Sequence, residues 1–221
     1  MGIDAGIFGD HTNFEHRYID DHKKLARLVE YWRDMGLRIV LTSGTWDLFH
    51  VGHARYLELA KEQGDILIVG VDSDAKVRKR KGPHRPVVPE EERVSVLSHI
   101  RHVDIITLKG PDDEQDALIR MIRPDVLTIS DSTGHPEDAL ERKAQYCGKI
   151  VRLVPQSTTS TTAKVRLLHV DGANRFANAL KPRITALIDE VVASSDPERA
   201  RALSAIIPDV VDEVLQQVRK V

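Results

Sequence analysis

Five short apolar runs punctuate the chain, and between them apolar residues recur every three or four positions. Uninterrupted Val, Ile and Leu predict strands buried on both faces, whereas the wider spacing predicts helices. The predicted strands are 38–42, 65–71, 103–108, 125–129 and 149–154. The predicted helices are 21–35, 53–63, 113–122 and 137–146, with one more that begins at Pro89. This alternation indicates an α/β fold, a Rossmann-like doubly wound five-stranded parallel sheet.

The same pattern divides the chain into three parts. Residues 1–36 hold an irregular arm and the first helix, and residues 37–170 hold the sheet. Residues 171–221 form a predicted helical C-terminal extension, whose last apolar stripe we interpret as core packing or as a contact between two copies. The stripe consists of Val210, Val211, Val214, Leu215 and Val218.

Composition narrows the class of protein. Hydrophobic residues make up 41% of the chain, which is enough for a core, and the net charge of −2 argues against a dedicated nucleic-acid binder. The single cysteine, Cys147, cannot form an intramolecular disulfide, which fits a reducing compartment. No apolar run is long enough to span a membrane, and the N-terminus lacks the pattern of a signal peptide. We therefore expect a cytoplasmic protein.

The first predicted strand leads into a glycine-containing turn and a helix start at residues 44–53. This arrangement brings backbone N–H groups to a phosphate in α/β proteins. His50 and His53 are spaced to share one face of the first helical turn, and Gly52 leaves room for a ligand. Two exposed histidines at a helix start are the plainer alternative. A zinc site is disfavoured, because the spacing is not that of H-E-x-x-H and no cysteine is near.

The segment G-T-W-D-L-F-H-V-G-H at residues 44–53 resembles the G-x-F-D-x-x-H-x-G-H signature of the cytidylyltransferase-like nucleotidyltransferases. Trp46 replaces the usual Phe, and the resemblance extends from about Arg38 to Leu168. It implies a nucleotidyltransferase domain over residues 37–170, in which His50 and His53 bind phosphoryl oxygens. The resemblance further implies an acceptor such as a sugar phosphate or an alcohol phosphate.

Six of the eleven residues in 76–86 are Lys or Arg. A solvated charge run or a nucleic-acid patch is one interpretation. A mobile loop that clamps triphosphate and substrate phosphate is the other, and the resemblance favours it through Lys81 and Arg85. The resemblance also aims Arg93 at the phosphates, although a salt bridge to a nearby glutamate explains it equally well. The remaining cations are expected in solvent: Lys76, Arg78, Lys79 and Arg80.

A hydroxyl-rich segment follows the fifth strand, and the resemblance implies that it opens a second helix on the triphosphate. Residues 160–162 fit best, because helical spacing begins directly after them, but residues 157–159 are an equally good string. The chain departs from its relatives at 154–156 and at 130–134. Because of these departures, the sequence does not determine which nucleotide base is bound or what forms part of the acceptor pocket.

Together these features predict nucleotidyl transfer from ATP or CTP to a small phosphorylated acceptor, a sugar phosphate or polyol phosphate. Pyrophosphate is released, Mg²⁺ is bound through the nucleotide phosphates rather than by protein ligands, and the protein is a homodimer. The predicted catalytic residues are His50, His53, Lys81 and Arg93. The predicted nucleotide-binding residues are Ser43, Gly44, Thr45, Gly52, Ser160, Thr161 and Thr162. The predicted substrate-binding residues are Asp47, Asp72 and Arg85.

Three alternatives remain open from the sequence. The acceptor could be a flavin or pyridine mononucleotide, or the protein could be a nucleotide-binding regulator without turnover. An RNA-binding module that uses residues 76–85 is the third, and it would show salt-sensitive affinity. Asp47 is also a candidate for binding Mg²⁺ or for a purely structural role in its turn.

Overall fold

The computed structural model describes residues 14–156, except 115, 132, 133 and 135, and scattered positions between 180 and 201. The chain divides into two compact units, Met1–Thr158 and Thr159–Val221. The described positions in the second unit are helical. The boundaries predicted after residues 36 and 170 stay predictions.

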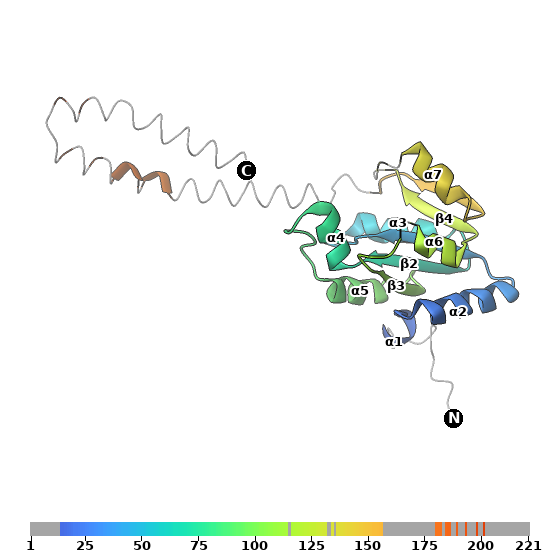
Figure 1. Cartoon of the computed structure of the whole chain (residues 1–221). Coiled ribbons are helices and arrows are strands. Elements are labelled where there is room, and N and C mark those ends of the chain that lie inside the picture. The colour runs from blue at the N-terminus through green and yellow to red at the C-terminus, as the bar shows by residue number, and fades with distance from the viewer. Residues whose placement is uncertain are drawn as a thin grey trace. The chain divides into compact units, whose positions relative to one another are not determined.

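A five-stranded, all-parallel sheet forms the centre of the first unit (Figure 1). The strands are β1 (Ile39–Gly44), β2 (Ile66–Asp72), β3 (Ile105–Lys109), β4 (Val126–Ser130) and β5 (Lys149–Leu153). They lie in the order β3-β2-β1-β4-β5. Each predicted strand is present within two residues at either end, so the predicted fold class is confirmed.

Seven helices in the described part of this unit surround the sheet. They are α1 (Phe14–Arg17), α2 (His22–Asp34), α3 (Val51–Lys61), α4 (Asp74–Lys81), α5 (Glu90–Ser98), α6 (Ala117–Ile122) and α7 (Glu137–Ala144). The expectation of an irregular arm up to residue 17 was wrong at α1. The expectation of a loop over the basic run was wrong at α4, because Ser73 caps that helix. Its Oγ accepts a hydrogen bond from the N–H of Lys76 at 3.2 Å, and the last turn carries four cations.

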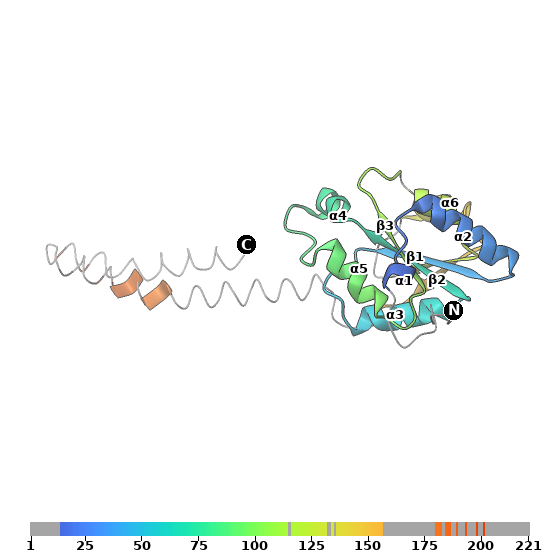
Figure 2. The ribbon, with the colours of Figure 1, turned by 90° about the horizontal axis from the view of Figure 1, so that it is seen from below.

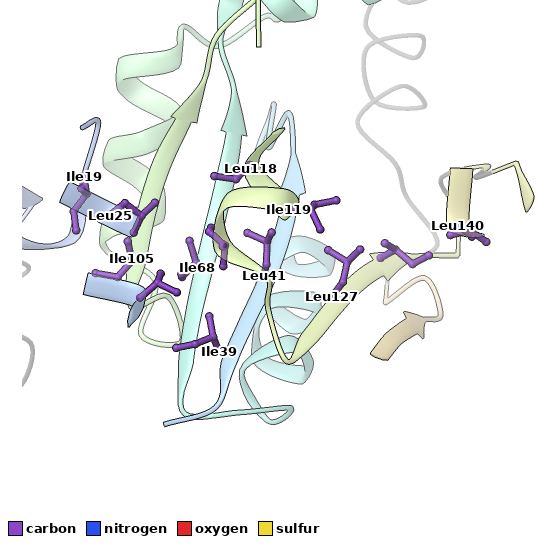
Figure 3. Close-up of a cluster of buried hydrophobic side chains, with 13 residues drawn as sticks. Ile19, Leu25, Ile39, Leu41, Ile68, Ile105, Leu118, Ile119, Leu127 and Leu140 are labelled. Atoms are coloured by element: carbon purple, nitrogen blue, oxygen red, sulfur yellow. The ribbon is translucent and has the colours of Figure 1, made fainter. Parts of the chain in front are cut away.

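Helices cover both faces of the sheet, as a doubly wound fold requires (Figure 2). Each face has its own apolar core. On one face, Leu25 of α2, Leu118 of α6 and Leu140 of α7 pack on Ile68 and Leu127 of the strands (Figure 3). On the other face, α3 and α5 cover the alternate strand residues. That second core includes Tyr56, Leu57, Ala60, Val69, Val94 and Leu97.

The sheet opens at the carboxyl ends of its two central strands. β1 pairs with β2 over six residues, but it pairs with β4 only at Val40 and Leu41. Beyond that point the Thr42 hydroxyl donates to the Thr128 carbonyl oxygen at 3.2 Å. The chain also reverses direction across the sheet between β1 and β4, which is where ligands bind in open α/β sheets. Among the described residues, no helix is long and apolar enough to cross a bilayer.

Candidate active site

The connection from β1 to α3, residues 44–53, is called the histidine loop. Trp46 and Leu48 adopt φ values of 57° and 47°, in the left-handed region that costs a non-glycine residue about 1–2 kcal/mol. The Trp46 indole holds this conformation, since its Nε1 donates to the Gly70 carbonyl oxygen at 3.3 Å. A Cβ at Gly44 would lie only 3.2 Å from the indole, so glycine permits the indole to pack here. The loop is therefore fixed by backbone geometry and ring packing.

The two histidine rings lie against one another at the start of α3. Their centroids are 4.0 Å apart with 23° between the planes, and Trp46 and Phe49 contact the His53 ring at 5.6 and 5.4 Å. His50 is the N-cap of the helix rather than part of its first turn. Its Nδ1 accepts a hydrogen bond from the N–H of Gly52 at 3.1 Å, which leaves the proton of the neutral ring on Nε2. Two adjacent imidazoles at a helix N-terminus can donate to phosphoryl oxygens.

Asp47 joins the histidine loop to the segment of residues 74–88, called the basic segment. The residue is 3% exposed, and its carboxylate accepts from the N–H groups of Val87 and Val88 at 3.0–3.2 Å and pairs with Arg85 at 2.8 Å. Asp47 and Arg85, both predicted to bind substrate, are thus partners of one another. This geometry favours the structural role for Asp47, and its contact with substrate stays a prediction.

Arg93 is the largest fully buried side chain among the described residues, with 2% of the residue's surface exposed. Its Nε donates to the Val88 carbonyl oxygen at 2.9 Å, and its Nη1 donates to the Thr45 carbonyl oxygen. Its Nη2 donates to the Asp72 carbonyl oxygen at 2.9 Å and to the Asp74 carboxylate at 2.8 Å. Four of its five N–H groups are therefore engaged, and within the described residues only the second N–H of Nη1 is left for the predicted contact with a phosphate.

Asp72 is buried at the end of β2 with a cation on each oxygen. Arg80 Nη2 lies 2.8 Å from Oδ2, and Lys109 Nζ lies 3.1 Å from Oδ1. Burial opposes ionisation, but Lys109 and Arg80 outweigh it, and the pKa of Asp72 lies below its ordinary value. Arg80 also donates to the Thr45 hydroxyl at 2.9 Å. Arg80 was expected in solvent, and 54% of its side chain is exposed, but its Nη2 also holds Asp72 and Thr45.

Lys81 lies in the last turn of α4, among other cations. Partial burial, then the charges of Arg80 and Arg85, lower the pKa of Lys81. Repulsion of this kind is relieved when an anion binds, which agrees with the predicted contact between Lys81 and a phosphate.

The other predicted residues lie as follows. Ser43 is exposed at the end of β1, Gly52 is buried in α3, and Thr45 is buried between Arg80 and Arg93. Ser160, Thr161 and Thr162, and the alternative string at 157–159, lie outside the described residues, so the register of that motif stays open.

Two residues at this edge were missed by sequence analysis, Arg80 and Lys109. Arg80 was one of six cations in a row, and only its spacing of four from Lys76, on a helix that was not predicted, could have singled it out. Lys109 is a lone lysine at a strand end, and the carboxyl edge of a parallel sheet was the only signal.

Magnesium, which the resemblance implies, finds no ready set of protein ligands here. Within residues 14–156 as far as they are described, no group of three or more His, Cys, Asp or Glu side chains could hold a metal ion. Asp47 and Asp72 are both paired with cations. The binding of Mg²⁺ through the oxygens of the nucleotide phosphates stays a prediction.

Comparison with known proteins identifies a family that this chain resembles over most of its length. A family model described as Cytidylyltransferase-like matches residues 41–196. The Bifunctional protein HldE of Sulfurimonas denitrificans is 35% identical over 158 residues, which cover 71% of this chain and 32% of that protein. The protein of the same name from Methylobacillus flagellatus is 42% identical over 141 residues, covering 62% of this chain and 28% of that protein. The chain thus spans about a third of the length of these relatives.

One solved structure with similar sequence is the lipopolysaccharide core biosynthesis protein from Thermoplasma volcanium. It is 30% identical with a TM-score of 0.48, and the alignment covers 54% of this chain and 98% of that chain.

Proposed function

We propose, from the premise that this chain belongs to the cytidylyltransferase-like family, that it transfers a nucleotidyl group from ATP or CTP to a small phosphorylated acceptor. The proposed acceptor is a sugar phosphate or a polyol phosphate. The observation that carries the proposal is the stacked pair of His50 and His53, held at the start of α3 beside the opening between β1 and β4.

The proposed reaction joins an oxygen of the acceptor phosphate to the α-phosphorus of the nucleotide. The bond from that phosphorus to the bridging oxygen breaks, and pyrophosphate leaves with the electron pair. The attacking oxygen is already an anion at neutral pH, so no strong general base is required. Catalysis then depends on positioning and on stabilising the charge that grows on the phosphoryl oxygens.

The histidine loop stabilises the growing charge, and the basic segment positions the phosphates. Nε2 of His50 and the ring of His53 donate hydrogen bonds to the phosphoryl oxygens where charge grows. Lys81 and Arg85 neutralise the phosphates, and Asp47 keeps Arg85 in place until a phosphate competes for it. Arg93 acts through others, because it ties Thr45 of the histidine loop to Val88 of the basic segment.

The experiment that tests this function measures pyrophosphate release in the presence of Mg²⁺. ATP, CTP, GTP and UTP are each combined with phosphorylated sugars, polyols and mononucleotides. Release that needs one nucleotide and one acceptor supports the proposal and names both. Tight nucleotide binding without release from any pair favours the regulator instead, and no nucleotide binding at all overturns both.

The predicted homodimer and cytoplasmic location stay predictions. Light scattering of the eluting peak during size-exclusion chromatography measures the oligomeric state directly. A mass equal to one chain of 24.8 kDa would contradict the dimer.

A further inference from the structure

Three cations gather around one buried carboxylate at the carboxyl ends of β2 and β3. Arg80 and Lys109 each pair with Asp72, as described above. Lys76 lies one helical turn before Arg80 on α4, and its Nζ donates to the Gly110 carbonyl oxygen at 3.0 Å. One carboxylate needs one cation to balance its charge, so this cluster holds more positive charge than Asp72 requires.

The excess charge acts on Lys76. Burial, then repulsion from Lys109, lowers the pKa of Lys76, and Arg80 adds to that repulsion. Asp113 and Asp72 attract it, but three cations still face only these two carboxylates. A partly buried ammonium crowded by like charges is stabilised when a further anion joins it.

The cluster also has unused hydrogen-bond donors. Within the part of the chain that the structure describes, Arg80 makes its bonds through Nη2 alone, to Asp72 and Thr45. Lys76 and Lys109 each donate a single bond there, although an ammonium has three N–H donors. Nε and Nη1 of Arg80, and two N–H groups on each lysine, therefore remain for water or a ligand.

The position of Lys109 brings this cluster to the predicted site. A Cβ at Gly70 would lie 2.8 Å from Ser43 Oγ and 3.1 Å from Lys109 Cδ. Because Gly70 has no side chain, the stem of Lys109 can lie across β2 beside the end of β1. Arg80 completes the connection through Thr45, which belongs to the histidine loop.

Resting on the proposed function, we propose that Lys76, Arg80 and Lys109 form a second anion subsite, which binds a further anionic group of the acceptor. That group is separate from the phosphate that receives the nucleotidyl group. The acceptor is then a sugar or polyol phosphate that also carries a second phosphate or a carboxylate. Both groups offer several acceptor oxygens, which suits the separate donors that remain on Arg80, Lys76 and Lys109.

The test measures the rate at which an amine-acylating reagent modifies individual lysines of the intact chain, read by mass spectrometry. The chain is saturated with a non-hydrolysable triphosphate analogue, and inorganic phosphate or acetate is then added. Lys79, exposed on the same helix, is the internal control. At a phosphate concentration about ten times its Kd, modification of Lys76 and Lys109 should slow about tenfold while Lys79 changes little. The acetate arm reports whether a carboxylate suffices.

Two variants make the result specific. Arg80→Gln should weaken the protection of Lys76 and Lys109, whereas Lys79→Gln should not. Thermal melting of both variants is the control for correct folding. Equal rates at all three lysines with and without phosphate would overturn the subsite. Protection that the triphosphate analogue produces alone, with no further effect of phosphate, would also overturn it, because the cluster would then serve the nucleotide.

Turnover separates this inference from the function on which it rests. Three matched acceptors are compared: a hexose monophosphate, the hexose bisphosphate and the hexuronic acid phosphate. A higher kcat/KM for a doubly anionic acceptor, lost in Arg80→Gln, agrees with the subsite, and an equal kcat/KM for all three contradicts it. Protection of the lysines without transfer to any acceptor leaves the subsite standing and contradicts the proposed function.

Discussion

The histidine loop and the basic segment face the same edge of the sheet, but they are held by different forces. The histidine loop is fixed by left-handed backbone, stacked rings and the hydrogen bond from Trp46 to Gly70. The basic segment is fixed by ion pairs, chiefly Arg85 with Asp47 and Arg80 with Asp72. A phosphate cannot compete for ring packing, but it can compete for a cation.

This difference matches two requirements of phosphoryl chemistry. Donors that stabilise the transition state work best when they are already oriented, because no reorganisation is then needed during the reaction. Cations that bind substrate must release it again, and an ion pair with a carboxylate gives each cation a partner between turnovers. The predictions below separate the two regions, from the largest expected effect to the smallest.

Arg93→Met should damage both regions, because this side chain joins them. The substitution leaves the carbonyl oxygens of Thr45 and Val88 and the carboxylate of Asp74 without their donor. We expect the free energy of unfolding to fall by about 3–5 kcal/mol, measured by urea denaturation. Arg101→Met, at an exposed arginine, is the matched control and should change little. An Arg93 variant as stable as the parent would show that these bonds do not hold the regions together.

His53→Ala should affect turnover alone. If this ring stabilises the transition state, kcat falls by roughly 10² or more while the melting temperature stays near that of the parent. His102→Ala, at a histidine before the amino end of β3, is the control. Near-normal activity in a correctly folded His53 variant would remove the histidine loop from the mechanism.

Asp47→Asn should affect acceptor binding more than the chemical step. The amide oxygen can still accept from Val87 and Val88, but the ion pair to Arg85 is lost, a contribution of about 1.5–3 kcal/mol. Because the acceptor phosphate no longer competes with this carboxylate for Arg85, we expect the KM of the acceptor to fall about tenfold with kcat nearly unchanged, since 1.4 kcal/mol is about tenfold in affinity. Asp112→Asn, at an exposed aspartate, is the control. A large loss of kcat instead would place Asp47 next to the reacting groups or a metal ion.

Asp72→Asn should change how stability depends on pH. The pKa of Asp72 is lowered in the folded chain, so its ion pairs stabilise fully above its ordinary value of 3.8. That stabilisation is lost as the pH falls through the lower, folded value. The parent should therefore lose stability more steeply than the variant below about pH 4, by chemical denaturation across that range. If stability falls equally steeply with pH in both proteins, the partners of Asp72 do not lower its pKa.

The strands were predictable because burial on both faces produces a recognisable pattern in the sequence. A strand with both faces covered is a continuous apolar run, so the run at 65–71 located β2 at Ile66–Asp72. The helix α4 was missed because only Val77 among its eight residues is buried, and no apolar stripe marks it. The signals present were local: a serine cap, an aspartate in the first turn and cations in the last.

The candidate site was predictable only in its short-range part. The H-x-G-H spacing placed two histidines together because the residues are neighbours in sequence. Apart from Val88, the side-chain partners of Arg93 and Lys109 lie 19 to 48 residues away, so no spacing rule could name them. Arg93 was expected at the phosphates, and whether it ever reaches them remains a prediction.

The contact between Trp46 and His53 has an optical consequence. The chain has two tryptophans, Trp32 and Trp46, so Trp32→Phe leaves a single indole, whose ring meets the imidazole of His53 edge to face. A protonated imidazole quenches indole fluorescence more strongly than a neutral one. The emission of that variant would then report the charge state of His53 during a titration, and a nucleotide that reorients the ring would change the emission without any added dye.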